Sequence, residues 1–188
     1  MSEPELLAGL LKKDEASFKH LVDSQKNRVY NTSLGIIQNS QEAEDITQEV
    51  FIQVLESIGD FKGESKLSTW IYRITITKSL EFIRKRKRIK RFGFIIRLFQ
   101  NGPGEPEVDV PDFVHPGVIL ENQERAAILF KAIDSLPENQ KIAFTLHKVE
   151  DLSYAEISKV MNVSLASVES LIHRAKHNLQ KKLENKFK

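Results

Sequence analysis

The fold is decided by residues 153–183, which read SYAEISKVMNVSLASVESLIHRAKHNLQKKL. Ser153 is a good N-cap, so a short helix is predicted to run from there to about Met161. Asn162 tolerates the left-handed conformation that a tight turn requires, and Ser164 can cap the longer helix that follows. Two helices joined by so short a turn are typical of a DNA-reading helix-turn-helix.

The longer of these two helices has two unlike faces. Its apolar residues recur at helical spacing and form one stripe: Val168, Leu171, Ile172, Ala175, Leu179 and Leu183. The residues facing away are small or polar, which permits close approach to base edges: Ala166, Ser170, His173 and His177. Lys176 can follow phosphates. The alternative interpretation is a plain helical hairpin packed in a bundle.

A second informative segment is the helix predicted over residues 42–58. Its core face is formed by Ile46, Val50, Phe51, Val54 and Ile58. The opposite face carries Glu42, Asp45, Glu49 and Glu56, with Ile52 beside them. Charges of one sign gain nothing from each other, and an outward-pointing isoleucine offers an apolar anchor. We therefore interpret this face as an interface, against the alternative of an ordinary solvated surface.

Charge is unevenly distributed along the chain, although the net charge is only +2. Residues 1–64 hold 6 Lys and Arg against 12 Asp and Glu, whereas residues 65–92 hold 10 against 1. Residues 84–91 include seven basic side chains in eight positions. Such a run favours a polyanion, because neutralised phosphates release their counterions. The alternatives are a solvated helix end, or an anionic lipid surface reached through the apolar residues at 92–96.

The remaining sequence also predicts helices. Apolar positions recur at three and four residues through 4–91, and alternating β-branched runs are missing. A break falls at residues 59–65, where Ser65 could cap the next helix. In that helix, Trp70 is predicted to lie in the core, whereas Tyr72 lies on the opposite face and could meet DNA or a partner.

Composition sets the domain organisation. Hydrophobic residues make up 40% and charged residues 29% of the 188-residue chain, which is enough to bury a core. Residues 101–117 hold four prolines and three glycines and are a linker by composition. We predict an all-α fold in which two small helical domains, residues 1–92 and 121–188, are joined by a flexible linker at 93–120.

Several classes of function are excluded by what the sequence lacks. Without cysteine there is no disulfide, thiol catalysis or cysteine metal site, which fits a reducing compartment. No glycine-rich phosphate loop, nucleophile elbow or metal-ligand cluster is found, so we expect neither an enzyme nor a cofactor. His173 and His177 are four residues apart but lack a third ligand, so no metal site is predicted. The most apolar stretch, residues 92–99, is interrupted by Arg97 and is too short to span a membrane, and we expect a cytoplasmic protein.

Four stretches together resemble the bacterial sigma factors of the extracytoplasmic-function (ECF) class, the small two-domain members of the sigma-70 family. They read AEDITQEVF at 43–51, FKGES and LSTWIYRI at 61–74, LPENQ and LSYAEI within 136–157, and VESLIHRA at 168–175. Each alone is of limited specificity, but they follow the family's order over nearly the whole chain. The likeness implies an alternative sigma factor that binds RNA polymerase core, recognises promoter −10 and −35 elements and helps to open the DNA.

The resemblance also implies partners and contact residues. The partners are the clamp helices of the largest polymerase subunit, the polymerase flap, promoter DNA and an anti-sigma factor, with the free protein a monomer. Core polymerase would be bound by Asp45, Gln48, Glu49 and Ile52. The −10 element would be contacted by Phe61, Lys62, Ser65, Lys66, Arg73, Thr77, Lys78, Arg84 and Arg88. The −35 element would be contacted by Tyr154, Ser164, Ser167, Ser170, His173, Arg174 and Lys176.

The main competing interpretation is a stand-alone helix-turn-helix repressor. Such a protein binds duplex DNA by itself, usually as a dimer on a palindrome. The acidic face within 42–58, the tryptophan-containing segment and the lack of a dimerisation helix all argue against it.

Overall fold

The computed structural model describes the backbone of residues 1–100 and 123–184 and the side chains of residues 1–89 and 128–184. Its elements are α1 (Glu3–Leu11), α2 (Glu15–Ile37), α3 (Ser40–Ser57), the 3₁₀ helix η1 (Ile58–Asp60), α4 (Leu67–Gln100), α5 (Gln123–Asp134), α6 (Glu138–Lys148), α7 (Tyr154–Met161) and α8 (Leu165–Glu184). All regular structure in these ranges is helical, which confirms the predicted all-α class. No helix in the searched part of the chain is long and apolar enough to cross a membrane.

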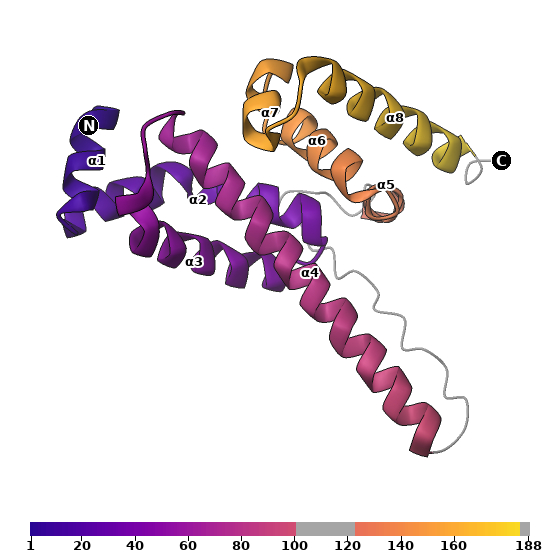
Figure 1. Ribbon diagram of the computed structural model, residues 1–188. Coiled ribbons are helices and arrows are strands. Elements are labelled where there is room, and N and C mark those ends of the chain that lie inside the picture. The colour runs from indigo at the N-terminus through magenta and orange to yellow at the C-terminus, as the bar shows by residue number, and fades with distance from the viewer. Residues whose placement is uncertain (101–122, 185–188) are drawn as a thin grey trace.

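Helices α1–α4 form the N-terminal helical unit (Figure 1). The face of α3 predicted to be its core is buried, with Val50 and Val54 at 0% exposure. The helix begins at Ser40 because the side chain of Asn39 accepts a hydrogen bond from the Glu42 amide at 2.9 Å. Hydrophobic periodicity thus predicted the orientation of α3 correctly, and its start to within two residues.

Helices α5–α8 form the C-terminal helical unit (Figure 1). Ser153 and Glu156 make a reciprocal capping box at the start of α7, and Asn162 ends that helix in the left-handed conformation at φ 54°. The Ser167 amide donates to the Ser164 hydroxyl at 3.2 Å, which caps α8. The predicted helix, turn and second helix are therefore confirmed.

The start of α4 differs from the prediction. Ser65 does not cap this helix, because its hydroxyl donates only to the carbonyl of Lys66, at 3.4 Å. Instead, the amide of Leu67 donates to the Glu3 carboxylate at 3.0 Å, across a separation of 64 residues. A carboxylate at a helix N-terminus satisfies a free N–H and opposes the positive end of the helix dipole. Helix α1 therefore fixes where α4 begins.

We expect Glu3→Gln to loosen the first turn of α4. Glutamine keeps an oxygen that can accept from Leu67, but it loses the negative charge that favours a helix N-terminus, which is worth about 0.3–1 kcal/mol. Backbone amides near Leu67 should then exchange with solvent several-fold faster in hydrogen-exchange mass spectrometry. Glu64→Gln removes the same charge from the exposed loop nearby and is the control. Equal exchange in both variants would mean that the carboxylate of Glu3 does not hold this helix.

Helix α4 continues to Gln100, beyond residue 93 where the linker was predicted to begin. Its 34 residues span about 50 Å at 1.5 Å per residue, and Figure 1 shows its distal half extending away from the bundle. The side chains of the apolar segment 92–99 and the remainder of the predicted linker lie outside the described residues. The domain boundaries at 92 and 121 stay predictions.

The two helical units pack against each other. Helix α6 lies against α2, and α7 lies against the first half of α4 (Figure 1). One apolar cluster is continuous across both units and includes Ile36, Ile71, Leu146, Ile157 and Ile172. A second cluster lies within the C-terminal unit and is built on Ala132, Ile133, Leu136, Ala175 and Leu179. The C-terminal unit therefore shares part of its core with the N-terminal unit.

Candidate functional site

The residues predicted to bind core polymerase lie together on the solvent side of α3. Asp45, Gln48 and Glu49 are exposed, and Ile52 is 56% exposed despite its apolar side chain. Glu42 differs from them because it pairs with Arg86 of α4, at 2.8 Å. We call Asp45, Gln48, Glu49 and Ile52 the acidic face. Exposed carboxylates around an isoleucine suit a basic partner with an apolar pocket.

The loop before α4 combines aromatic and basic side chains. Phe61 is half-buried, and its ring lies 5.4 Å from that of Trp70. Lys62 and Lys66 are exposed on either side of Gly63, whose φ of 70° gives the loop its tight turn. The aromatic pair anchors one end of the loop, and the lysines face solvent. Trp70 is half-buried and packs against the main apolar cluster, in line with its predicted place on the core side of its helix.

The predicted −10 residues on α4 fall into two groups. Lys78 is half-exposed and Arg88 is exposed. The side chains of Arg73, Thr77 and Arg84 already have partners within the chain. Arg73 donates to the Lys159 carbonyl at 2.6 Å, Thr77 donates to the Arg73 carbonyl at 2.8 Å, and Arg84 lies 3.5 Å from Glu138.

The predicted −35 residues lie on the outer side of α7 and α8. His173, Arg174 and Lys176 are exposed, and Ser170 is half-buried. Ser164 and Ser167 lie at the exposed start of α8, where their hydroxyls are 2.8 Å apart. Tyr154 is half-buried, and its ring packs edge-on against His147. The exposed part of this set is therefore one turn-and-helix surface.

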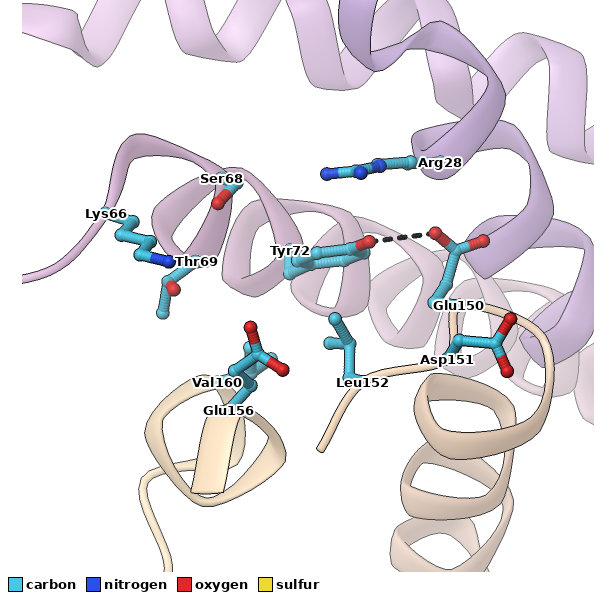
Figure 2. A pocket seen from close by; sticks show the side chains of 10 residues that line it. All are labelled: Arg28, Lys66, Ser68, Thr69, Tyr72, Glu150, Asp151, Leu152, Glu156 and Val160. Atoms are coloured by element: carbon cyan, nitrogen blue, oxygen red, sulfur yellow. Dashed lines mark hydrogen bonds between the residues drawn. The ribbon is translucent and has the colours of Figure 1, made fainter. Parts of the chain in front are cut away.

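A cavity of about 360 Å³ lies between the two helical units (Figure 2). Figure 2 shows the Tyr72 hydroxyl pointing at the Glu150 carboxylate, to which it donates at 2.8 Å, with Arg28 beside the pair. Tyr72 is 4% exposed, so its partner is the C-terminal unit of the same chain. Sequence patterns placed Tyr72 opposite the core of its helix but carried no signal for Glu150.

Burial raises the pKa of both groups in this hydrogen bond. It raises the pKa of Glu150 above its usual 4.5, against the opposing effects of the Tyr72 hydroxyl and the Arg28 charge. Burial also raises the pKa of the Tyr72 hydroxyl, with the neighbouring Glu150 charge adding to the effect. The tyrosine is therefore a neutral donor, and burial disfavours the charged form of the Glu150 side chain that accepts its hydrogen bond.

We expect Glu150→Gln to stabilise the folded chain at pH 8 but not at pH 4. A carboxyl whose folded pKa is raised contributes most at low pH, and that contribution is lost as pH rises through the folded pKa. The amide keeps an acceptor for Tyr72 and carries no charge to bury. The melting temperature should therefore rise relative to wild type at pH 8 and converge with it at pH 4. A lower melting temperature at pH 8 would show that the carboxylate charge is favourable there.

No group of three or more His, Asp or Glu side chains that could hold a metal occurs in the searched part of the chain. The candidate surfaces are instead exposed charges and helix ends suited to binding macromolecules. These surfaces are the acidic face on α3, a basic surface along α4, and the helix-turn-helix of α7 and α8.

Two family models match the chain, and both describe parts of one family. "Sigma-70 region 2" matches residues 21–89, which cover most of α2 through the charged part of α4. "Sigma-70, region 4" matches residues 123–179, from α5 into α8. The acidic face falls in the first match and the helix-turn-helix in the second.

Two curated relatives match over nearly their whole length. The ECF RNA polymerase sigma factor SigW of Bacillus subtilis is 29% identical over 174 residues, covering 93% of this chain and 92% of that relative. The ECF RNA polymerase sigma-E factor of Escherichia coli is 26% identical over 188 residues, covering 98% and 95%.

Solved structures share the fold. CnrH, in complex with the cytosolic domain of CnrY, superimposes with a TM-score of 0.68 at 16% identity, covering 97% of each chain. The sigma factor RpoE of Bartonella quintana, in complex with the anti-sigma factor NepR, gives 0.64 at 18% identity, covering 89% of this chain and 96% of RpoE. With both regions matched in order and full-length relatives of this class, the chain belongs to the sigma-70 family as a member of its ECF class.

Proposed function

We propose that the protein is an alternative sigma factor that binds RNA polymerase core and directs it to promoters by recognising −10 and −35 elements. One observation carries the proposal. A single chain presents an exposed acidic face on α3, a basic surface on α4 and a helix-turn-helix on α7 and α8. A stand-alone repressor has no need of the acidic face.

Each surface would bind a different partner. The acidic face would bind the clamp helices of the largest polymerase subunit, and the C-terminal unit would reach the flap. The loop at 61–66 would hold a base removed from the stack, a step that costs a few kcal/mol. Lys78 and Arg88 on α4 would contact phosphates of the opened strand. Helix α8 would enter the major groove at the −35 element through Ser167, Ser170, His173 and Arg174.

We further propose that the protein acts in the cytoplasm, carries no catalytic activity of its own and is controlled by an anti-sigma factor. The structural neighbour from Bartonella quintana was solved with an anti-sigma factor, and CnrH with the cytosolic domain of CnrY. Those complexes support a comparable protein partner for this chain, since the same fold is shared over nearly its whole length.

Run-off transcription with purified bacterial core polymerase tests the function. Genomic fragments are transcribed with and without the protein, and start sites that depend on it are expected. The protein alone should bind duplex DNA weakly, because part of its predicted DNA surface is occupied within the chain. Absence of start sites together with tight duplex binding by the free protein would instead support a repressor.

A further inference from the structure

We propose that the distal part of α4, residues 84–99, binds the surface of a membrane that contains anionic lipids. Two adjacent blocks of the helix carry the inference. Residues 84–91, the basic block, include seven Lys and Arg. Residues 92–99, the apolar block, consist of six apolar residues, one glycine and one arginine. Binding to lipid does not depend on the proposed function.

The segment lies at the distal end of a long helix. Helix α4 has 34 residues, and Figure 1 shows its distal half extending away from the bundle. Arg86 still contacts the bundle through its ion pair with Glu42, at 2.8 Å. Beyond that pair, Lys87, Arg88 and Ile89 are all exposed. The end of α4 is therefore placed where a large, flat partner can approach it.

The basic block is largely exposed. The side chain of Arg84 is 67% exposed, and Lys85, Lys87 and Arg88 are exposed as well. Each basic residue near an anionic lipid surface strengthens binding roughly fivefold, and the attraction decays within a Debye length. Charge alone does not distinguish a lipid surface from a nucleic acid, because both present many phosphates.

The apolar block is what favours lipid. Ile89, just before it, is 60% exposed despite its apolar side chain. At 100° per residue, the apolar positions at 92–99 cover an arc of roughly 200° around the helix, and Ile89 lies within roughly 20° of its edge. Gly93 and Arg97 fall outside this arc. An apolar arc beside basic residues is typical of a helix in the membrane interface, where headgroups meet acyl chains. A DNA backbone offers no such apolar layer.

Membrane binding would keep the protein from promoters. Arg84 and Arg88 belong both to the basic block and to the predicted −10 contacts, so lipid and DNA would compete for them. This consequence rests on the proposed function. The membrane surface would then hold a pool of protein that is inactive in transcription, and the size of that pool would follow the anionic lipid content.

Flotation of the full-length protein with lipid vesicles, over a series of lipid concentrations, tests the site. The protein should float with vesicles of phosphatidylglycerol and phosphatidylcholine, and binding should be at least about tenfold weaker on phosphatidylcholine alone. Binding to the anionic vesicles should also weaken as salt is raised, because salt screens exposed charges. Absence of binding to the anionic vesicles would overturn the proposal.

Two variants separate charge from apolar contact. Lys87→Gln with Arg88→Gln removes two exposed charges and should weaken vesicle binding about 30-fold, with a smaller dependence on salt. Ile95→Ser with Phe99→Ser changes positions near the middle of the apolar arc and should weaken binding at least about tenfold, with the salt dependence unchanged. If the second variant floats as wild type does, charge alone holds the protein, and the proposed lipid site is wrong.

Matched controls change the same kinds of residue elsewhere. Lys19→Gln with Lys26→Gln removes two exposed charges from α2. Leu11→Ser with Val149→Ser removes two exposed apolar side chains, which are 53% and 46% exposed. Both control pairs should bind vesicles as wild type does. Losses equal to those of the α4 variants would overturn the assignment of the site to α4.

A dye reports the contact within the folded protein. The chain has no cysteine, so Ile96→Cys accepts a single dye that is sensitive to the polarity around it. Its emission should shift to the blue on anionic vesicles, whereas the same dye on Lys26→Cys of α2 should not respond. Unchanged emission from position 96 would overturn the contact between the apolar block and lipid.

Run-off transcription with added vesicles tests the competition. Anionic vesicles should reduce transcripts made with wild type severalfold, and should affect the Ile95→Ser, Phe99→Ser variant much less. Vesicle binding without any loss of transcripts would overturn the competition and leave the lipid site standing. If no transcripts form even without vesicles, the sigma-factor proposal fails and the competition fails with it, while flotation still decides the lipid site.

Discussion

Reversing two charges on the acidic face, with Asp45→Lys and Glu49→Lys, is expected to remove most binding to core polymerase. Both side chains are exposed on α3 and lie beside the outward-pointing Ile52. Breaking a close charge pair in an interface costs about 2–5 kcal/mol, and placing like charges opposite one another adds to the loss. We expect affinity for core polymerase to fall at least about 100-fold, with protein-dependent start sites lost at the same concentration.

The matched control changes net charge equally at other exposed positions. Glu15→Lys and Asp23→Lys both lie at exposed positions of α2, outside the acidic face. This pair should bind core polymerase nearly as wild type does in biolayer interferometry. Equal loss in both pairs would show that total charge, rather than this face, governs the binding.

Neutralising two basic residues of α4 is expected to weaken promoter engagement in a salt-dependent manner. Lys78→Gln and Arg88→Gln remove two charges, one at a half-exposed and one at an exposed position of α4. Each phosphate contact contributes roughly 0.7–0.9 to the slope of log affinity against log salt. The slope for polymerase carrying this variant should therefore be smaller by about 1.5–2 than with wild type.

The measurement is the affinity of the assembled polymerase for one promoter fragment across a series of salt concentrations. Lys19→Gln with Lys26→Gln removes two exposed charges from α2 and should leave the slope unchanged. If the α4 variant keeps the wild-type slope, its two residues do not touch phosphates, and the basic run at 84–91 is a solvated helix end.

Local sequence patterns predicted the elements of this fold well. The buried face of α3, the left-handed Asn162 and the caps at Ser153 and Ser164 all follow from signals within one or two helical turns. Each depends on neighbours in sequence, so periodicity and cap chemistry are sufficient. The predicted contact residues are placed mainly on exposed surfaces by the same periodicity, and their roles stay predictions.

The contacts between the helical units had no such signal. Those made by Tyr72, Arg73 and Lys141 join residues separated by 78, 86 and 105 positions. The cap that Glu3 provides for α4 spans 64 positions. A Cβ atom at Gly35 of α2 would lie 2.4 Å from Cγ2 of Thr145 on α6, and an isolated glycine in a helical pattern often marks such a close approach. A single sequence does not say what approaches it.

The apolar cluster shared by both helical units has a consequence for unfolding. Segments that share a core open together, whereas segments with separate cores open as independent cooperative units. The chain should therefore melt in one transition, and Leu146→Ala in α6 should lower the hydrogen-exchange protection of α2 as well as that of α6. If the two units were separated, the same substitution should lower the hydrogen-exchange protection of α6 but not that of α2. Whether the two units are packed together could therefore be determined from whether Leu146→Ala lowers protection in both units or in one.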